Sequence, residues 1–360
     1  MSKFQVPIGP NHPLLKEPLS VLLTVEGEQV LDGILRIGYV HRGIERLCQE
    51  RSYTQAVHLI ERVCGICSQV HSTTYCQAVE SLLEVEIPPR AQYIRGLMCE
   101  LERIHSHLMW LGVLAKNIGL DTVFMYAWRD REIVLDLMEE ISGGRVSHAV
   151  NIIGGVKVDL DQRLKDLIGQ KLNELAPKLE VALGLFENED SVRLRTQGIG
   201  RLTKEEIQRY GVVGPVARAS GVIKDVRKEI PRLPYSNVDF ELISHSDGDV
   251  WARTLVRIKE TRQSLKIIQQ ILSAIPEGEI AIRVKKNIPD NEAVSRFEAP
   301  RGEVFYYIRS NGSDKPARLK IRTPTLPVLS TLSLQVRNVN FADIPVILSG
   351  IDLCIACADR

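Results

Sequence analysis

Two pairs of cysteines at opposite ends of the chain constrain its fold more than any other feature. Cys64 and Cys67 form one Cys-x-x-Cys pair, and Cys354 and Cys357 form the other, almost a full chain length away. Four thiolates are the full ligand set for a tetrahedral zinc, an iron–sulfur cluster, or a nickel or iron centre. A structural zinc more often takes its ligands from short local knuckles. The separation therefore favours a metal site that organises the whole fold.

The cysteine count also favours metal chemistry over a disulfide framework. The 360 residues include seven cysteines, an odd number in a large chain that lacks a secretory signal. Cys48, Cys76 and Cys99 stand alone in the sequence. We expect these three to be small buried apolar side chains on helix faces.

Charge and hydropathy argue against a nucleic-acid partner and against a transmembrane helix. The 46 Lys and Arg residues nearly balance the 45 Asp and Glu residues and are dispersed, so nucleic acid is not an expected partner. No apolar run reaches the roughly 18 residues of a transmembrane helix, and the N-terminus lacks the apolar core of a signal peptide. We therefore expect a cytoplasmic protein that other subunits hold at any membrane where it works.

Hydrophobic periodicity predicts a mainly α fold with small β elements, in the α+β class. The helical spacing of apolar residues predicts four long helices, over residues 89–116, 122–141, 161–186 and 250–274. Shorter helical stretches are expected within 45–83, with an interruption near Cys64. Paired strands are expected at 19–25 with 29–37 and at 303–310 with 317–322.

These elements predict three regions that pack as one unit. The first is an N-terminal β-containing region, residues 1–44, and the second is a helical bundle, residues 45–290. The bundle is expected to carry a long surface excursion near 211–247, because that segment is rich in Gly, Pro and Ser. The third is a C-terminal α+β region, residues 291–360, which carries the second cysteine pair.

The residues around both cysteine pairs resemble the paired motifs of the large subunit of [NiFe] hydrogenases. These are Glu-Arg-Val-Cys-Gly-Ile-Cys at 61–67 with His71, and Asp-Leu-Cys-Ile-Ala-Cys at 352–357. Other segments are similar to the 49-kDa-type subunit of respiratory complex I, namely Gly-Pro-Asn-His-Pro at 9–13, His-Arg-Gly-Ile-Glu at 41–45, Glu-Arg-Ile-His-Ser-His at 102–107, and Gly-Gly-Val at 154–156. Membrane-bound, energy-converting hydrogenases of the Ech type combine both sets, and the likeness covers essentially the whole chain.

The resemblance implies a [NiFe] hydrogenase large-subunit fold around a binuclear nickel–iron centre with diatomic ligands on iron. By this likeness, Cys64 and Cys354 are terminal ligands of nickel, whereas Cys67 and Cys357 bridge nickel and iron. Cys354 is then the thiolate that accepts a proton when dihydrogen is split heterolytically. The resemblance implies no flavin and no NAD in this chain.

The same likeness assigns roles to residues outside the cysteine pairs. Glu17 matches the proton-transfer glutamate, with a solvated residue entering a strand as the alternative. His71 matches the histidine that hydrogen-bonds a bridging sulfur, or else is an ordinary core histidine. Arg301, in Glu-Ala-Pro-Arg-Gly at 298–302, matches the arginine above the metals, or else is a surface ion-pair partner. Pro324 and Thr325 match a proline and a hydroxyl residue near the ligands of iron.

One departure concerns a third metal. Common soluble hydrogenases end in a histidine that helps to bind magnesium or iron together with a glutamate matching Glu45. Here the last residue is Arg360, and a protonated arginine cannot ligate a cation. We therefore expect Glu45 to pair with Arg360 or its surroundings, and the third metal is not favoured.

The sequence thus predicts an enzyme, the catalytic subunit of an energy-converting [NiFe] hydrogenase that reversibly reduces protons to dihydrogen. The resemblance implies an iron–sulfur small subunit, ferredoxin or a ferredoxin-like subunit as electron donor, and integral membrane subunits that pump ions. It also implies a peripheral place on the cytoplasmic face of the cell membrane. Two alternatives stay open, a metal-free complex I-like subunit of the quinone chamber and a protein with a structural zinc at the four cysteines.

Overall fold

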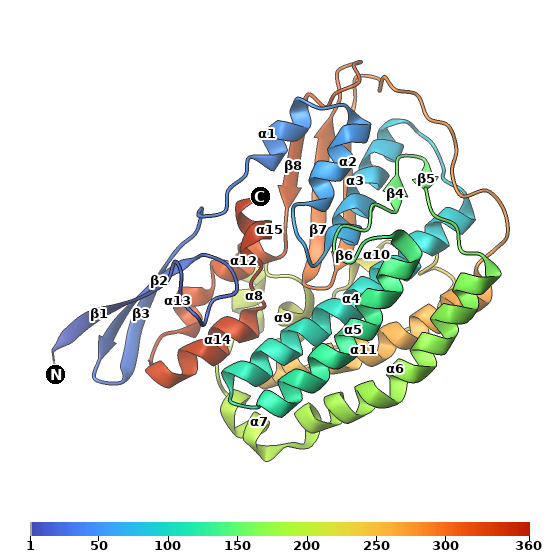
Figure 1. The fold of residues 1–360 in the computed structure, drawn as a ribbon. Coiled ribbons are helices and arrows are strands. Elements are labelled where there is room, and N and C mark those ends of the chain that lie inside the picture. Colours follow the sequence, from blue (N-terminus) through green and yellow to red (C-terminus); the bar gives the residue numbers. More distant parts are fainter. Residues whose placement is uncertain (1) are drawn as a thin grey trace.

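The computed structural model describes residues 2–360 (Figure 1). Its strands are β1 (Lys3–Ile8), β2 (Ser20–Glu26), β3 (Gln29–Arg36), β4 (Asn151–Ile152), β5 (Gly155–Val156), β6 (Glu292–Ala299), β7 (Gly302–Arg309), β8 (Arg318–Arg322) and β9 (Val339–Asn340). Its longer helices are α3 (Ser68–Leu82), α4 (Pro89–Asn117), α5 (Asp121–Ser142), α6 (Gln162–Asn188) and α11 (Val250–Ala274). The shorter ones are α1 (Ile44–Gln49), α2 (Tyr53–Glu61), α7 (Asp190–Thr196), α8 (Lys204–Tyr210), α9 (Gly214–Arg218), α10 (Val226–Glu229), α12 (Thr325–Leu329), α13 (Leu332–Gln335), α14 (Ile344–Ile351), α15 (Ile355–Asp359) and the 3-10 turn η1 (Phe341–Asp343).

Helix α4 is the central member of the helical bundle, and α5, α11, α3 and α14 all pack against it. Pro89 occupies its first turn, where the missing N–H needs no intrahelical partner. Leu97, Leu101 and Leu108 are fully buried along its length. The predictions of a mainly α, α+β fold and of long helices at α4, α5, α6 and α11 are confirmed.

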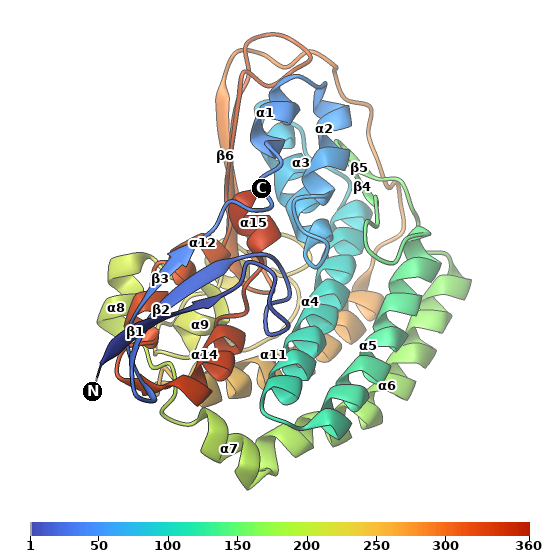
Figure 2. The same cartoon turned by 60° about the vertical axis from the view of Figure 1, so that its left-hand side comes forward.

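The N-terminal sheet projects from one side of the bundle, with strand order β1-β2-β3-β9 (Figures 1 and 2). Buried and less buried residues alternate along β2, as expected of a sheet with one covered face. The predicted pair of strands is confirmed as β2 and β3, whereas β1 was not predicted. Pro7 argues against a strand, yet β1 lies at the sheet edge, where proline is tolerated.

A second sheet, β6-β7-β8, packs against α3. The predicted pairing of strands around Asn311-Gly312 is confirmed as β7 with β8. Strand β6 was not predicted, because glutamate and alanine, which make up half of its residues, are uncommon in strands. Its pairing with β7 along its whole length stabilises the extended conformation.

The prediction of a surface excursion over residues 211–247 is wrong for much of this segment. Arg218, Asp225 and Arg227 are buried in it, with exposures of 1%, 3% and 4%. Arg218 forms ion pairs with Glu260 and Glu298, at 2.8 and 2.7 Å. The Gly- and Pro-rich composition indicated an exposed loop. Inside the protein, however, Arg218 pairs with carboxylates on α11 and β6, and Arg227 pairs with Asp225 and with Glu100 on α4.

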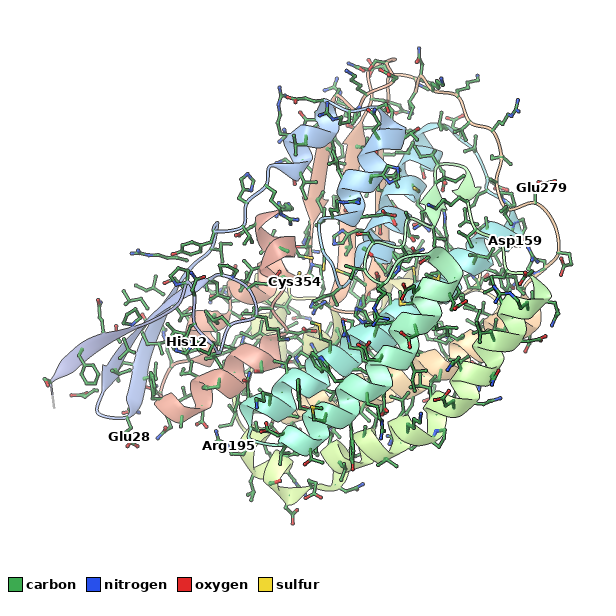
Figure 3. The ribbon with its side chains drawn as sticks, viewed as in Figure 1. His12, Glu28, Asp159, Arg195, Glu279 and Cys354 are labelled. Atoms are coloured by element: carbon green, nitrogen blue, oxygen red, sulfur yellow. The ribbon has the colours of Figure 1, made fainter. Side chains whose placement is uncertain are left out.

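Two apolar cores meet at the C-terminal helix α15. Cys354 and Cys357 belong to the core of the long helices and the second sheet. Ile355 and Ala358, between and beside them, belong to the core beneath the N-terminal sheet. The second cysteine pair therefore lies at the junction of the two cores, near the middle of the molecule (Figure 3).

Among residues 2–360, no helix has both the length and the apolar content needed to cross a membrane.

Candidate metal centre

Each cysteine pair leads into a helix N-terminus. Cys67 is the N-cap residue of α3, and Cys354 is the N-cap residue of α15. The sulfurs of Cys64 and Cys354 lie 3.3 Å apart, and those of Cys67 and Cys357 lie 3.8 Å apart. The fold therefore brings the two ends of the chain together at one cluster of sulfurs.

The thiols of this cluster are free and buried. The neighbouring sulfurs of Cys354, Cys64 and Cys67, followed by burial, raise the pKa of Cys357 well above that of an ordinary thiol. The pKa of Cys64 is lowered, first of all by its hydrogen bond with Cys354. Four thiolates cannot coexist at this density without positive charge among them. The donor set is therefore suited to metal ions, and the sulfurs meet in two overlapping groups within 4.8 Å, Cys64 with Cys354 and Cys357, and Cys67 with Cys357 and His71.

His71 lies one turn into α3 and reaches the cluster. Its Nε2 is 3.5 Å from the sulfur of Cys357, and its Nδ1 is 2.7 Å from the hydroxyl of Tyr306. Burial lowers the pKa of His71 to about 4, so the ring is neutral at physiological pH. A neutral ring carries one N–H, and Tyr306 decides which nitrogen it occupies. If the tyrosine donates to Nδ1, His71 donates from Nε2 to the sulfur.

Arg301 is buried beside the residues that lead into Cys354. Its guanidinium donates to the Asp352 carboxylate at 2.9 Å, to the Asp352 carbonyl at 3.1 Å and to the Ser106 hydroxyl at 3.3 Å. Asp352, in a left-handed conformation with φ of 59°, also faces Arg257 at 3.6 Å. Arg257 in turn stacks on the ring of Trp110 at 4.1 Å. The alternative of Arg301 as a surface ion-pair partner is excluded, because its exposure is only 5%.

The backbone turn that carries Arg301 depends on a close contact between Gly214 and Gly302. Gly214 has φ of 73°, and a Cβ there would lie 2.2 Å from the carbonyl oxygen of Arg301. Gly302, with φ of 128°, meets Gly214 from the other side. Side chains at either position would push the turn away, so both glycines are required for this approach.

Glu17 lies in the segment between β1 and β2 and contacts the other end of the chain. Its carboxylate accepts hydrogen bonds from the backbone N–H groups of Ile355 and, at 3.3 Å, of Ala356. Burial is the largest influence on its pKa, which is raised. The carboxyl therefore lies directly beside the backbone that follows Cys354, rather than in solvent.

Pro324 and Thr325 begin α12, near the second cysteine pair. Thr323, just before them, donates its hydroxyl to the backbone carbonyl of Cys357 at 3.0 Å. The Thr325 hydroxyl is buried and finds no hydrogen-bond partner among residues 2–360. A buried hydroxyl without a partner is unusual, and it is available to a group bound at the cluster.

Glu45 pairs with Arg360, as the sequence predicted. Arg360 Nε lies 3.0 Å from the Glu45 carboxylate, which also accepts from the backbone N–H of Ile321 and from Lys320. Although burial opposes them, these donors together lower the pKa of Glu45. Its carboxylate is occupied by cations and an N–H, which argues against a third metal there.

Two residues that hold the backbone around the cysteines by hydrogen bonds were not predicted from the sequence. Arg42 donates to the carbonyls of Val63 and Ala356, at 3.0 Å each, and so ties the two segments together. Glu102 accepts from the backbone N–H groups of Gln69 and Val70, at 2.7 and 3.0 Å, in the first turn of α3. Arg42 and Glu102 both lie in motifs noted above, but those motifs do not indicate which backbone groups the two side chains contact.

The single cysteines are separate from the cluster, as predicted. Cys48, Cys76 and Cys99 are completely buried. Burial raises the pKa of Cys48 to about 12 and the pKa values of the other two thiols still further. They are neutral apolar side chains at physiological pH.

Two family models match the chain. The model for the respiratory-chain NADH dehydrogenase 49 Kd subunit matches residues 117–288 and 281–360. The model for nickel-dependent hydrogenase matches residues 42–133, which include the first cysteine pair. Together the two matches span residues 42–360, which include both cysteine pairs.

Curated relatives match over nearly their full lengths. The carbon monoxide-induced hydrogenase of Rhodospirillum rubrum is 41% identical, covering 100% of both chains. The alpha subunit of the membrane-bound hydrogenase of Pyrococcus furiosus is 38% identical over 99% of this chain and 87% of its own. An NADH-quinone oxidoreductase subunit of Thermodesulfovibrio yellowstonii is 34% identical over 99% of this chain and 97% of its own. The chain therefore belongs to the family that unites the large subunits of membrane-bound, energy-converting hydrogenases with the 49-kDa subunits of respiratory complex I.

Proposed function

We propose that this chain is the catalytic subunit of an energy-converting [NiFe] hydrogenase that interconverts dihydrogen with two protons and two electrons. The observation that carries the proposal is the meeting of four buried cysteine sulfurs from opposite ends of the chain. A family member that works without a metal has no need of four soft ligands at one point.

The residues present fit a nickel–iron centre. Cys64, Cys67, Cys354 and Cys357 would hold it, and their thiolates are the soft ligands that such metals bind. The unpartnered Thr325 hydroxyl supports the fit, because a diatomic ligand on iron would accept its hydrogen bond. When bound, the centre would supply the redox chemistry of dihydrogen.

The proton path is assigned to Cys354 and Glu17. Cys354 accepts a proton when dihydrogen is oxidised. Glu17, whose carboxylate is hydrogen-bonded to the backbone N–H groups of the two residues that follow Cys354, then accepts the proton. Burial raises the pKa of Glu17 above its ordinary value, which favours proton uptake by this carboxyl. Next to Glu17 is a cavity of about 30 Å³ that Asn117 and Ser349 also line, which is room for one water molecule. A water molecule in this cavity is the proposed next carrier of the proton after Glu17.

Arg301 and His71 are assigned to electrostatic control of the site. The Arg301 guanidinium, oriented by Asp352 and Ser106, places a fixed positive charge beside four thiolates. His71 donates to the sulfur of Cys357 and so lowers the electron density on a bridging ligand. Both side chains are buried, and the low dielectric around them strengthens these electrostatic effects.

The electrons require partner subunits. The cysteines outside the cluster are buried and isolated, so an iron–sulfur small subunit must carry electrons to or from the centre. Ferredoxin is the proposed donor, and membrane subunits that pump ions are the proposed anchors. The chain would then lie at the cytoplasmic face of the membrane. The relatives named as membrane-bound and NADH-quinone enzymes support an assembly of this kind.

Metal analysis of the complex, purified anaerobically from its native host, tests the proposal. We expect nickel and iron in stoichiometric amounts with this chain, together with dihydrogen production from a low-potential reductant. Zinc without nickel would contradict the proposal and favour a structural site. Absence of any metal from the four cysteines would favour a complex I-like subunit, to which the 49-kDa match also points.

A further inference from the structure

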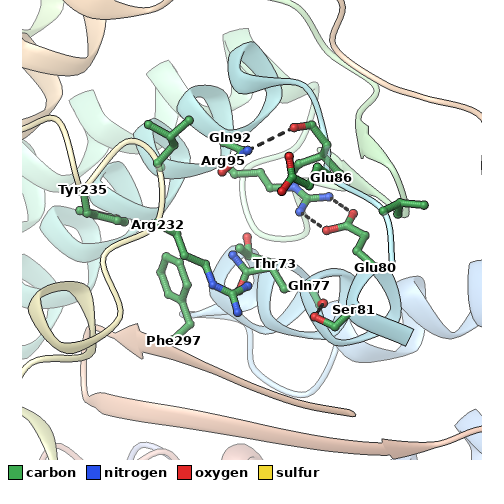
Figure 4. A pocket seen from close by; sticks show the side chains of 14 residues that line it. Thr73, Gln77, Glu80, Ser81, Glu86, Gln92, Arg95, Arg232, Tyr235 and Phe297 are labelled. Carbon is green, nitrogen blue, oxygen red and sulfur yellow. Dashed lines mark hydrogen bonds and ion pairs between the residues drawn. The ribbon is translucent and has the colours of Figure 1, made fainter. Parts of the chain in front are cut away.

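A separate cavity of about 430 Å³ opens between α3, the first turns of α4, strand β6 and the segment around Pro234 (Figure 4). It shares no residue with the cysteine cluster or with the side chains that contact that cluster. Gly96 allows the wall to form, because a Cβ there would lie 2.4 Å from the ring of Pro234. The cavity is therefore built by the fold at a second location.

Arg232 extends into this cavity from the loop that precedes Tyr235, toward Thr73 and Gln77 (Figure 4). The residue as a whole is exposed, but burial of its guanidinium lowers its pKa, although the charge of Glu80 acts in the opposite direction. Within residues 2–360, the Arg232 guanidinium has no hydrogen bond and no ion pair. A positive charge that is only partly shielded from water and has no carboxylate in contact is available to an anion.

Arg95 on α4, whose exposure is only 3%, also lines the cavity. Its two terminal nitrogens bind the Glu80 carboxylate, at 3.0 and 2.7 Å, and one of them also donates to the carbonyls of Ile152 and Gly155. The charge of Glu80 is therefore already neutralised. The Arg95–Glu80 pair forms a neutral part of the cavity wall and leaves Arg232 as the unpaired cation.

The surrounding charges also favour an anion. The cavity lies against the first two turns of α4, where the helix dipole is positive. The amide and hydroxyl groups of Gln92 and Ser81 line the same space, although each also bonds to a nearby backbone carbonyl. Glu86 is exposed at the rim, and its charge is screened by solvent.

We propose that this cavity binds a small organic oxyanion. Its carboxylate or phosphate group pairs with the Arg232 guanidinium, whose planar fork matches two oxygens of either group. A single inorganic ion would leave most of the 430 Å³ empty, so the ligand carries additional polar atoms that reach Gln92 and Ser81. This site is independent of the metal centre and of the proposed function.

Calorimetric titration of the purified complex, in a buffer free of phosphate and carboxylates, tests the proposal. Citrate and glycerol 3-phosphate are the two probes, one for each kind of oxyanion. We expect at least one probe to bind, with affinity reduced by about tenfold or more in Arg232→Gln and by less in Arg232→Lys, which keeps the charge but not the fork. Arg201→Gln is the matched control, because Arg201 is also an exposed arginine but lies outside the cavity.

The two probes separate the chemical classes. Binding of citrate alone assigns a carboxylate ligand, and binding of glycerol 3-phosphate alone assigns a phosphate ester. Failure of both probes at millimolar concentration would overturn the proposal. So would binding that Arg232→Gln leaves unchanged, or that Arg201→Gln weakens equally.

Discussion

Replacing Glu17 by glutamine separates proton transfer from metal binding. The new side chain has the same size, but it cannot take up or release a proton. A positioned acid or base contributes about 10²–10⁴-fold to a proton-transfer rate, so we expect dihydrogen production to fall by about a hundredfold or more. Nickel content should not change, because Glu17 contacts backbone N–H groups rather than a cysteine sulfur.

The structural effect of the same substitution is small. The glutamine oxygen still accepts from the Ile355 N–H, but the amide nitrogen then faces the Ala356 N–H. Loss of one hydrogen bond to a charged group costs about 1.5–3 kcal/mol. This lowers the unfolding midpoint without preventing assembly.

The assay compares dihydrogen production and nickel content in the purified complex. Glu205→Gln serves as the control, because Glu205 is an exposed carboxylate on α8, far along the chain from the cluster. Turnover that stays within about twofold of the parent at full nickel content, well short of the expected loss, would refute the relay. Loss of nickel together with activity would make Glu17 a structural support for the α15 backbone instead.

Three further predictions follow from the contacts described above. Cys354→Ser replaces a soft ligand by a hard one, so nickel and activity should both be lost, whereas Cys48→Ala should retain nickel by elemental analysis. Tyr306→Phe leaves His71 Nδ1 without a partner, so thermal unfolding should show destabilisation by about 1–3 kcal/mol; an unchanged midpoint would contradict the contact. Burial raises the pKa of Glu61 from 4.5 to about 7, so the folded chain binds a proton that the unfolded chain lacks, and stability falls as pH rises through that interval. Glu61→Gln should therefore stabilise the chain more above neutral pH than in mild acid, and a pH-independent difference in the unfolding midpoint would contradict this.

Local patterns in the sequence were sufficient for most elements. The apolar rows of α4, α6 and α11 repeat at the helical period because one face must be buried against neighbouring helices. The capping box that begins α8 is another local pattern, since Thr203 and Glu206 are three residues apart. Strand β6 was missed because its residues favour a strand only when β7 is beside them.

The candidate site was predictable in its ligands but not in its supports. The two Cys-x-x-Cys pairs indicated a metal site, and the pairing of Glu45 with Arg360 was predicted from the family resemblance and the arginine at position 360. Tyr306, Arg257 and Arg42 carry no such signal. Each is an ordinary residue type that becomes part of the site through one long-range contact.

The sequence by itself determined which cysteines are candidates for a metal site, the long helices and the apolar character of the remaining cysteines. Only the tertiary structure decided which charges are buried, as Arg218 within 211–247 illustrates, and which are left without a partner, as in Arg232. The physical reason is the separation along the chain between the residues that interact. Periodicity and capping depend on residues a few positions apart, whereas a buried ion pair or an empty cavity depends on which distant segments the whole fold brings together.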